Sequence, residues 1–433
     1  MSPDKRLDKT RRIVEEIARH LDIDASVQLW DGSRIPLGPN VTSNLAIAVN
    51  SPGTLTSLLR RPTLDRLIRH YAHGRIDVVG GSVLDLGKRL GAKETRRQFR
   101  KINKRSLLKQ AIPLLFGTAD KPDASRGFDG DEVGDGAARA DEKRNIQFHY
   151  DISNEFYKLF LDEAMIYTCG YFTDWSNTID QAQQDKLEMI CRKLRLKPGE
   201  RLLDIGCGWG GLVCYAAKNY GVQAVGVTLS EEQCGLANET IARLGLQEQV
   251  EVRLQNYLHV DEVFDKIASI GMYEHIGVKA YPTYFAKIQS MLAAGGLFLN
   301  HGITRRGKRK HKSFSKRPEQ RALLKYIFPG GELDDIGNTV REMEIAGFEI
   351  HDVEGWREHY AMTTEHWCEC LTARKDEAIA IAGPETYRIW VAYLAGCSLA
   401  FSRGSARIYQ TLAGKNARGP SVLPPTREDL YRP

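Results

Sequence analysis

The chain has 433 residues, more than one ordinary domain, and its 42% hydrophobic and 27% charged residues are typical of a globular protein, which excludes wholesale disorder. No apolar run reaches the ~18 residues that a membrane helix needs, and the first residues predict no secretory signal. The net charge of +6 and eight scattered cysteines without a CxxC pair predict a mildly basic protein with reduced thiols and no metal site.

The first 116 residues predict a small α/β unit. Ile13, Ile17 and Leu21 recur at the spacing of one helix face. The elements expected next are hairpin strands at 27–29 and 35–37, a strand at 45–49, a helix at 54–71 and a strand at 74–78. No pattern here indicates chemistry, so we interpret 1–116 as an accessory domain for packing, lipid docking or dimerisation.

Two segments are predicted to lack stable structure. Residues 117–143 are rich in Gly, Asp and Ala and hold almost no large apolar side chains. Such a segment cannot bury enough surface to offset the entropy cost of ordering it. We therefore expect a flexible linker at 117–143, a main domain at 144–412 and a disordered tail at 413–433.

The main domain alternates strands and helices. The strands expected are 201–205, 224–229, 250–254, 266–272, 296–303, 348–353 and 406–412, with helices at 212–219, 231–244 and 281–292 among them. Alternation over this length predicts an α/β fold with a doubly wound, mostly parallel sheet.

A glycine-rich turn stands between the first of these strands and its helix, in LLDIGCGWGG at 202–211. Glycines allow the sharp bend and the close approach of a ligand, and the following helix offers free N–H groups. The spacing fits both GxGxG and the dinucleotide fingerprint GxGxxG. A nicotinamide site requires an acid at the end of the next strand, where Thr228 stands. The turn and Asp204 before it resemble motif I of the class I methyltransferases that bind S-adenosylmethionine.

Three further blocks carry a more specific resemblance. They are FHYDISNEFY at 148–157, MIYTCGYF at 165–172 and SIGMYEHIG at 269–277. With the glycine turn, they resemble the cyclopropane-fatty-acyl-phospholipid synthases, of which the mycolic acid cyclopropane synthases are a related branch. The resemblance implies a class I methyltransferase Rossmann-like fold for 144–412. It also implies transfer of the methyl group of S-adenosylmethionine to a cis double bond of an unsaturated phospholipid, followed by ring closure.

The resemblance also implies a bound bicarbonate ion as the base. Its holders would be Cys169, Glu274, His301, Tyr360 and the backbone of Ile303. A buried anion needs donors on all sides, which a histidine, a tyrosine hydroxyl and a backbone N–H can provide. Taken singly, the cysteine, histidine and tyrosine could be ordinary core residues. Cys397 aligns with a cysteine sometimes proposed as catalytic in the family, although its apolar surroundings favour a structural role.

The cofactor set implied by the resemblance comes from four segments. Its members are Tyr167, Thr168, Asp204, Gly206, Cys207, Gly208, Thr228, Gln233, Gln255 and Asn256. The amides of the glycine turn would face the methionine carboxylate. The family often has an acid where Asn256 stands. Aromatic faces can stabilise the carbocation intermediate, and the candidates are Tyr167, Tyr171, Phe172, Tyr273 and Tyr360.

A run of eight basic residues follows the predicted strand that ends near Ile303. Its members are Arg305, Arg306, Lys308, Arg309, Lys310, Lys312, Lys316 and Arg317. Each basic residue near an anionic leaflet contributes ~1 kcal/mol, so the run predicts peripheral contact with the inner face of the cytoplasmic membrane. No nucleic-acid motif accompanies it, so we expect no nucleic-acid partner. We also expect a homodimer, with the linker letting the accessory domain reach a neighbouring subunit.

Three alternatives remain open at the level of sequence. The same carbocation could lose a proton elsewhere and give a methyl- or methylene-branched acyl chain, although Cys169 and the bicarbonate set favour ring closure. A nicotinamide-dependent oxidoreductase would use the same glycine turn, against which Thr228 argues. A lipid-binding protein without activity would be expected to carry broken motifs, and the motifs are intact.

Overall fold

The computed structural model describes residues 3–91, 95, 97–98, 101, 111–120, 153–307, 320–321, 326–327, 331–416 and 423–431. Contacts divide the chain into two compact units. The first unit joins residues 1–129 to 371–399, and the second joins 130–370 to 400–433. Residues 121–143 of the predicted linker and the block at 148–152 lie outside the described residues. The start of the predicted linker is held in place, because the Asp120 N–H donates to the Gly53 carbonyl at 3.2 Å and its carboxylate accepts from Thr54 Oγ1 at 3.0 Å. The division differs from the predicted domain boundaries, because 371–399 group with the N-terminal residues.

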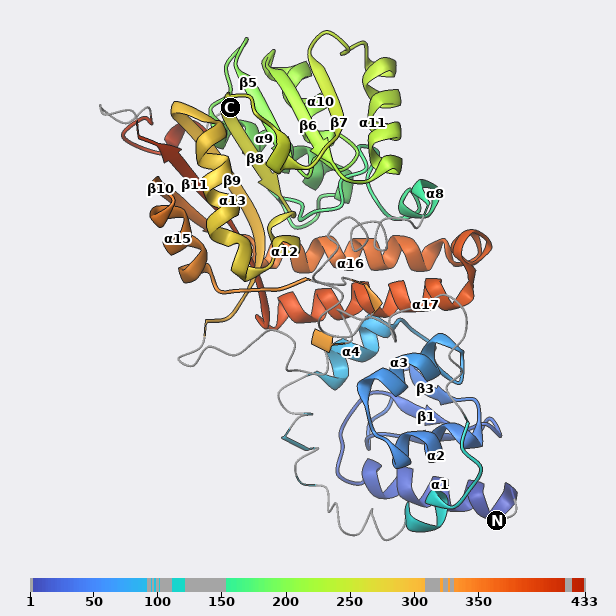
Figure 1. The fold of residues 1–433 in the computed structure, drawn as a ribbon. Coiled ribbons are helices and arrows are strands. Elements are labelled where there is room, and N and C mark those ends of the chain that lie inside the picture. Colours follow the sequence, from blue (N-terminus) through green and yellow to red (C-terminus); the bar gives the residue numbers. More distant parts are fainter. Residues whose placement is uncertain are drawn as a thin grey trace. The chain divides into compact units, whose positions relative to one another are not determined.

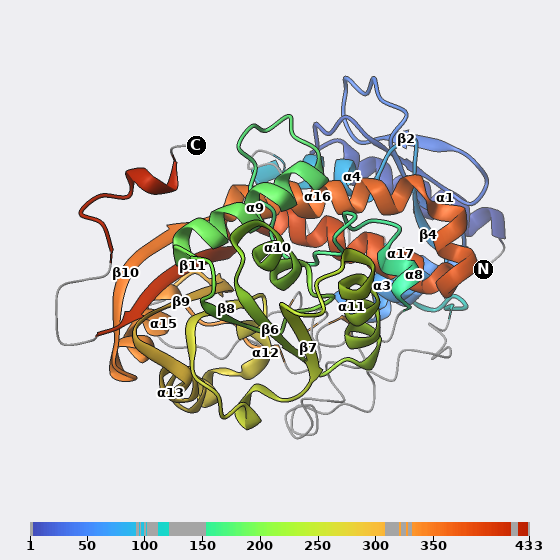
Figure 2. The ribbon, with the colours of Figure 1, turned by 90° about the horizontal axis from the view of Figure 1, so that it is seen from above.

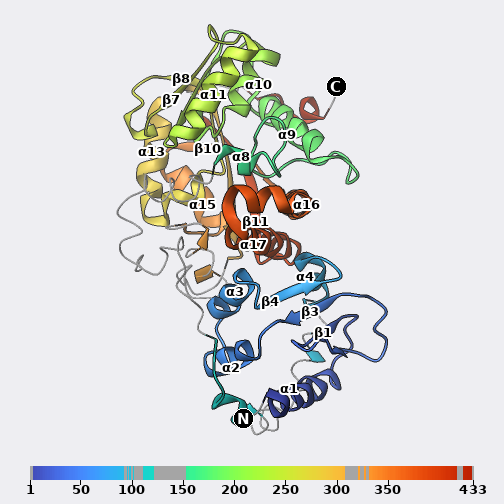
Figure 3. The same cartoon turned by 90° about the vertical axis from the view of Figure 1, so that its right-hand side faces the viewer.

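The first unit is built on a sheet with the strand order β2-β1-β3-β4. Its elements are α1 (Pro3–Ala18), β1 (Ser26–Gln28), β2 (Arg34–Pro36), β3 (Ala46–Val49), α2 (Pro52–Arg60), α3 (Leu64–Ala72), β4 (Ile76–Val79) and α4 (Val83–Leu90). The predicted hairpin is present, since β1 and β2 pair antiparallel. Helices α2 and α3 contact β3 and β4, respectively (Figure 3).

The single helix predicted at 54–71 is wrong. The chain forms two helices there, α2 and α3, separated at residues 61–63. Pro62 disfavours helical geometry at the residue before it, so α2 ends at Arg60. Thr63 then starts α3, because its side chain accepts a hydrogen bond from the Arg66 N–H.

Helix α17 (Lys375–Ser402) explains why a distant segment groups with the first unit. Gly383 interrupts its helical geometry with φ of +82°, immediately before Pro384. Arg388 then donates to both carboxylate oxygens of Asp77, at 3.1 and 2.7 Å, and lies over the Tyr71 ring. A bidentate arginine–carboxylate pair is among the stronger side-chain contacts, and it ties α17 to β4.

The second unit contains a seven-stranded sheet with the order β10-β11-β9-β8-β5-β6-β7 (Figure 1). The strands are β5 (Arg201–Ile205), β6 (Gln223–Thr228), β7 (Val250–Leu254), β8 (Phe264–Ile270), β9 (Leu292–Arg305), β10 (Phe348–Gly355) and β11 (Ala406–Lys415). Strands β5 to β9 pair in parallel, and β11 is antiparallel to both of its neighbours. This is the doubly wound α/β fold predicted from the sequence.

Helices cover both faces of this sheet (Figure 2). One core contains residues of α9 (Ile179–Leu194), α10 (Gly211–Tyr220) and α11 (Glu231–Leu244). The other contains residues of α13 (Tyr281–Met291) and α15 (Ile336–Ile345). Leu202 and Leu203 of β5 belong to opposite cores, as the alternation of side chains along a strand requires. The smaller helical elements are α8 (Asn154–Tyr157), η2 (Tyr257–His259), α12 (Tyr273–Ile276) and η3 (Val278–Ala280), and the long helix α16 (Arg357–Ala373) follows β10.

The end of the chain differs from the disordered tail that the sequence predicts. Strand β11 continues to Lys415, and residues Glu428–Leu430 form the short helix η5. Leu430 is buried, and Asp429 forms a salt bridge of 2.9 Å with Arg195 at the end of α9. Leu423 also packs against a core of the second unit, so isolated apolar residues anchor this segment without a periodic pattern. Across the described residues, no helix is both long and apolar enough to cross a membrane.

Candidate active site

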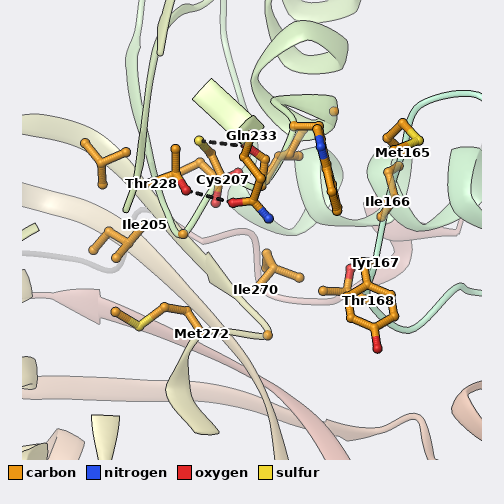
Figure 4. A pocket seen from close by; sticks show the side chains of 18 of the residues that line it. Met165, Ile166, Tyr167, Thr168, Ile205, Cys207, Thr228, Gln233, Ile270 and Met272 are labelled. Carbon is orange, nitrogen blue, oxygen red and sulfur yellow. Dashed lines mark hydrogen bonds between the residues drawn. The ribbon is translucent and has the colours of Figure 1, made fainter. Parts of the chain in front are cut away.

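A pocket opens in the second unit at the carboxyl ends of β5 and β6 (Figure 4). The chain order reverses beside β5, because β6 extends the sheet on one side and β8 on the other. Ligands of doubly wound folds bind at such switch points. Of the predicted cofactor residues, all but Asn256 line this pocket. The Asn256 side chain instead accepts a hydrogen bond from the Leu258 N–H and caps η2.

The glycine turn bends with positive φ at Gly206, Gly208 and Gly210. The N–H groups of Gly206 and Cys207 donate to the Val227 carbonyl, at 2.9 and 3.1 Å. These two amides therefore hold the turn against β6. The expectation that the amides of the turn face a carboxylate does not apply to them, and a carboxylate would have to use later amides of the turn.

The end of β6 is rigidified by side chains. Thr228 Oγ1 donates to Gln233 Oε1 at 2.7 Å, which Figure 4 shows as a dashed line. Ser230 caps α11, with its hydroxyl accepting from the Gln233 N–H at 3.3 Å. The threonine that replaces the acid of a nicotinamide site is thus part of a fixed Thr–Gln pair beside the pocket.

Lys186 of α9 lines the pocket and was missed by the sequence analysis. Its Nζ donates to Thr168 Oγ1 at 2.7 Å, and burial lowers its pKa to about 8. Burial raises the pKa of Asp204 to about 7 and that of Asp162 to about 6, although Lys186 opposes both shifts. The sequence did hold a signal for Lys186. This lysine is next to Leu187 and one turn before Ile190, on the apolar side of α9.

Glu274 and His301 are both buried polar residues near the pocket, on α12 and β9. The Glu274 Oε1 atom accepts from the Ile303 N–H at 2.6 Å, and burial raises the pKa of this carboxyl to about 7. Burial lowers the pKa of His301 well below its ordinary value, so its ring is neutral. Glu274 Oε2 and His301 Nε2 have no hydrogen-bond partner within the described part of the chain. The Ile303 N–H is occupied by Glu274, which differs from the expectation that it holds an anion.

Trp356 links the remaining predicted residues. Its ring lies 5.0 Å from that of His301, and its carbonyl is 3.8 Å from Cys169 Sγ. Burial raises the pKa of Cys169, so the group is a neutral thiol. Tyr360 lies in the first turn of α16, where its N–H donates to the Trp356 carbonyl at 3.1 Å. Its ring packs on Phe401. Trp356 was not among the residues predicted from the sequence.

The predicted aromatic candidates fall into two groups. Tyr167 lines the pocket, with its ring 5.1 Å from that of Trp367, and the Tyr171 ring lies tilted against Trp356 at 4.7 Å. Phe172 stacks on His366 at 5.7 Å. Tyr273, by contrast, is fully buried against Tyr281 and hydrogen-bonded to Thr339, so it acts as a core residue.

The two other predicted sites are Cys397 and the basic run that starts at Arg305. Cys397 belongs to the first unit, whereas Cys169, Glu274, His301 and Tyr360 belong to the second. Arg305 does not fit a membrane-facing role, because it ends β9 with its side chain 12% exposed and paired with the buried Asp334 at 3.4 Å. Arg306 is exposed. Lys308, Arg309, Lys310, Lys312, Lys316 and Arg317 lie outside the described residues.

Comparisons with known proteins agree with this geometry. A family model described as mycolic acid cyclopropane synthetase matches residues 137–411. A probable fatty acid methyltransferase of Pseudomonas putida is 37% identical over 95% of this chain and 97% of its own length. Cyclopropane mycolic acid synthase 3 of Mycobacterium tuberculosis is 37% identical over 61% of this chain and 95% of its length.

Solved structures show the same relationship. The cyclopropane synthase MmaA2 from Mycobacterium tuberculosis has a TM-score of 0.61 and 32% identity, over 63% of this chain and 98% of that one. The mycolic acid cyclopropane synthase CmaA1, complexed with SAH and CTAB, has a TM-score of 0.59 and 34% identity, also over 63% and 98%. The likeness lies in the C-terminal part of the chain, as the residues of the family match show.

Proposed function

Because this chain belongs to the mycolic acid cyclopropane synthetase family, we propose that it transfers the methyl group of S-adenosylmethionine to a cis double bond of an unsaturated phospholipid. Loss of a proton then closes a cyclopropane ring. The observation that carries the proposal is the junction at α12. His275 and Ile276 of this helix line the pocket, while Glu274 between Tyr273 and His275 faces the Ile303 amide. One short helix thus supplies two residues to the pocket and a buried carboxyl group to β9, the strand that carries His301.

S-adenosylmethionine supplies the electrophilic methyl group. The pocket residues fit such a ligand, because nothing lies within 4 Å of a Cβ position at Gly208, which leaves room for close backbone approach, and the Thr228–Gln233 pair offers fixed polar groups. A solved relative is described as complexed with SAH. An alkene is a weak nucleophile, so Tyr167, Ile270 and Met272 at the pocket would position the chain and exclude water.

The residues next to the pocket also fit a bicarbonate ion, which when bound supplies the base that accepts the methyl proton. The buried ring nitrogen Nε2 of His301 has no hydrogen-bond partner among the described residues. The buried carboxyl oxygen Oε2 of Glu274 has none there either. A carboxyl group with a pKa of about 7 is partly protonated at neutral pH and can donate to an anion. We propose Cys169, Glu274, His301 and Tyr360 as the anion's neighbours, with the Ile303 amide orienting Glu274.

A second candidate function has its own support. The relative from Pseudomonas putida, which matches nearly the whole chain, is described as a probable fatty acid methyltransferase. The same methyl transfer would then end in a branched acyl chain. Loss of a proton from a chain carbon next to the cation leaves a methyl branch beside a double bond. A hydride shift that moves the cation to the methyl-bearing carbon, followed by loss of a proton from the new methyl group, leaves a methylene branch.

The test is to incubate the protein with unsaturated phospholipid vesicles and methyl-labelled S-adenosylmethionine, and to analyse the acyl chains by mass spectrometry and proton NMR. We expect ring protons to appear as vinyl protons disappear. A gained carbon with retained or rearranged vinyl protons would establish the branched product. Parallel incubation with free unsaturated fatty acid tests whether the substrate has to be a phospholipid. Absence of label from every lipid would refute both candidates.

A further inference from the structure

Three polar residues form a row across the sheet from β10 to β9. Glu354 is paired in register with Gln410, and Gln410 is paired with His301 on its other side. Directly opposed residues of antiparallel strands project from the same face, so these side chains are neighbours. Lys193 of α9 packs against this row, with its side chain 0% exposed. The row ends at a histidine of the proposed active site.

Lys193 fixes the orientation of the Gln410 amide. Its Nζ lies 2.8 Å from Gln410 Oε1 and forms a salt bridge with Glu354. An ammonium group can only donate, so the amide atom facing it has to be the carbonyl oxygen. The amide NH₂ group of Gln410 then points the other way, 3.3 Å from His301 Nδ1.

Gln410 in turn fixes the position of the His301 ring proton. An NH₂ group donates, so Nδ1 accepts and carries no hydrogen. A neutral imidazole holds one proton, which therefore resides on Nε2. Nε2 is the buried ring atom without a partner among the described residues. Trp356 restricts rotation of the ring, since it lies 5.0 Å from His301 and 5.3 Å from Lys193 Nζ.

We propose that Lys193 and Gln410 are positioning residues that hold His301 as the Nε2–H tautomer, so that this N–H donates to an anion in the active site. The identity of the anion as bicarbonate rests on the proposed function. The tautomer itself follows from the Lys193–Gln410–His301 contacts alone.

The first test is a ¹⁵N NMR measurement of the histidine rings in the full chain without substrate. We expect His301 to show a protonated Nε2 and an unprotonated Nδ1, with the signal identified by its loss in His301→Asn. In Gln410→Glu the new carboxylate still pairs with Lys193, but it can only accept a hydrogen bond from the His301 ring. Nδ1 should therefore become protonated, and this shift identifies the signal independently if His301→Asn does not fold.

The second test measures how labelling of unsaturated phospholipid vesicles depends on bicarbonate concentration. Gln410→Leu removes the donor to Nδ1, so the concentration for half-maximal rate should rise about tenfold, with a smaller change at saturation. Arg427→Gln is the matched control. Arg427 pairs with Asp352 at the exposed side of the same cluster, and its loss should leave the bicarbonate dependence unchanged.

A protonated Nδ1 in the unaltered protein would overturn the inference, and so would an unchanged bicarbonate dependence in Gln410→Leu. Failure of the proposed function has a different signature. No lipid would then be labelled by any variant, while the NMR measurement would still decide the tautomer.

Discussion

At the scale of single residues, burial sets the charge of the groups around the site. The carboxyl groups of Glu274 and Asp204 each have a pKa raised by burial to about 7, and burial lowers the pKa of Lys186 to about 8. The neutral forms of such groups are accessible near physiological pH, which would allow the proposed bicarbonate ion to lie beside a carboxyl group.

The variant Glu274→Gln should separate the protonation of this carboxyl group from cofactor binding. Because the native pKa of Glu274 is about 7 against 4.5 for the free group, the native state binds more protons than the unfolded state between these values. Its contribution to the free energy of unfolding is therefore full below pH 4.5 and falls as pH rises through about 7, by about 3 kcal/mol in all. Relative to the unaltered protein, the variant should gain stability over this window.

Denaturant unfolding at a series of pH values measures the difference, with the exposed Glu248→Gln as the control whose curve should stay parallel. Turnover of Glu274→Gln should be lost while S-adenosylmethionine affinity, measured by calorimetry, stays within a few fold. A large loss of cofactor affinity would show that Glu274 is part of the cofactor site.

At the scale of elements, the turn between β5 and α10 determines how closely a ligand can approach. Gly206 and Gly208 both have positive φ, so alanine costs about 1–2 kcal/mol at either position. Their surroundings differ. A Cβ atom at Gly206 would lie 2.9 Å from Met272 Cγ, whereas at Gly208 nothing lies within 4 Å in the structure.

The two alanine variants should therefore fail in different ways. We expect Gly206→Ala to be the less stable protein in thermal unfolding without ligand, because Met272 has to move. Gly208→Ala should lose only the stability that the backbone strain costs. Its methyl group would enter the open pocket and weaken S-adenosylmethionine binding by tenfold or more. Equal melting temperatures with equal cofactor affinities would contradict this description of the turn.

At the scale of the whole molecule, the sequence predicted most elements because apolar runs and caps are local signals. The ranges 201–205, 231–244 and 250–254 coincide with β5, α11 and β7. The helix at 54–71 was wrong because one proline outweighed its periodicity. Three of the predicted cofactor segments meet at one pocket because they stand at the carboxyl ends of β5, β6 and β7, whereas Tyr167 and Thr168 reach it from the segment before α9. Lys193 and Gln410 could not be predicted, since the contact of Gln410 with His301, and of Lys193 with Gln410 and Glu354, depends on the register of β9, β11 and β10.

The basic run from Arg305 to Arg317 gives a prediction about the molecule as a whole. With Arg305 paired to Asp334, the remaining cations would have to supply any attraction to an anionic membrane. Reversing Lys308, Lys310 and Lys312 to Glu should weaken binding to anionic phospholipid vesicles by tenfold or more, since each cation near the surface contributes about 1 kcal/mol. The control carries the same charge change at the exposed Lys197, Lys218 and Arg243.

Vesicle sedimentation at low and high salt distinguishes the two sets. Binding of the unaltered protein should fall as salt rises, because screening shortens the reach of surface charges. The control should follow the unaltered protein, and the triple reversal in the run should bind weakly at every salt concentration. If both triple variants lose the same affinity, net charge alone governs binding and the run has no particular role. If neither does, the protein reaches its lipid without this segment.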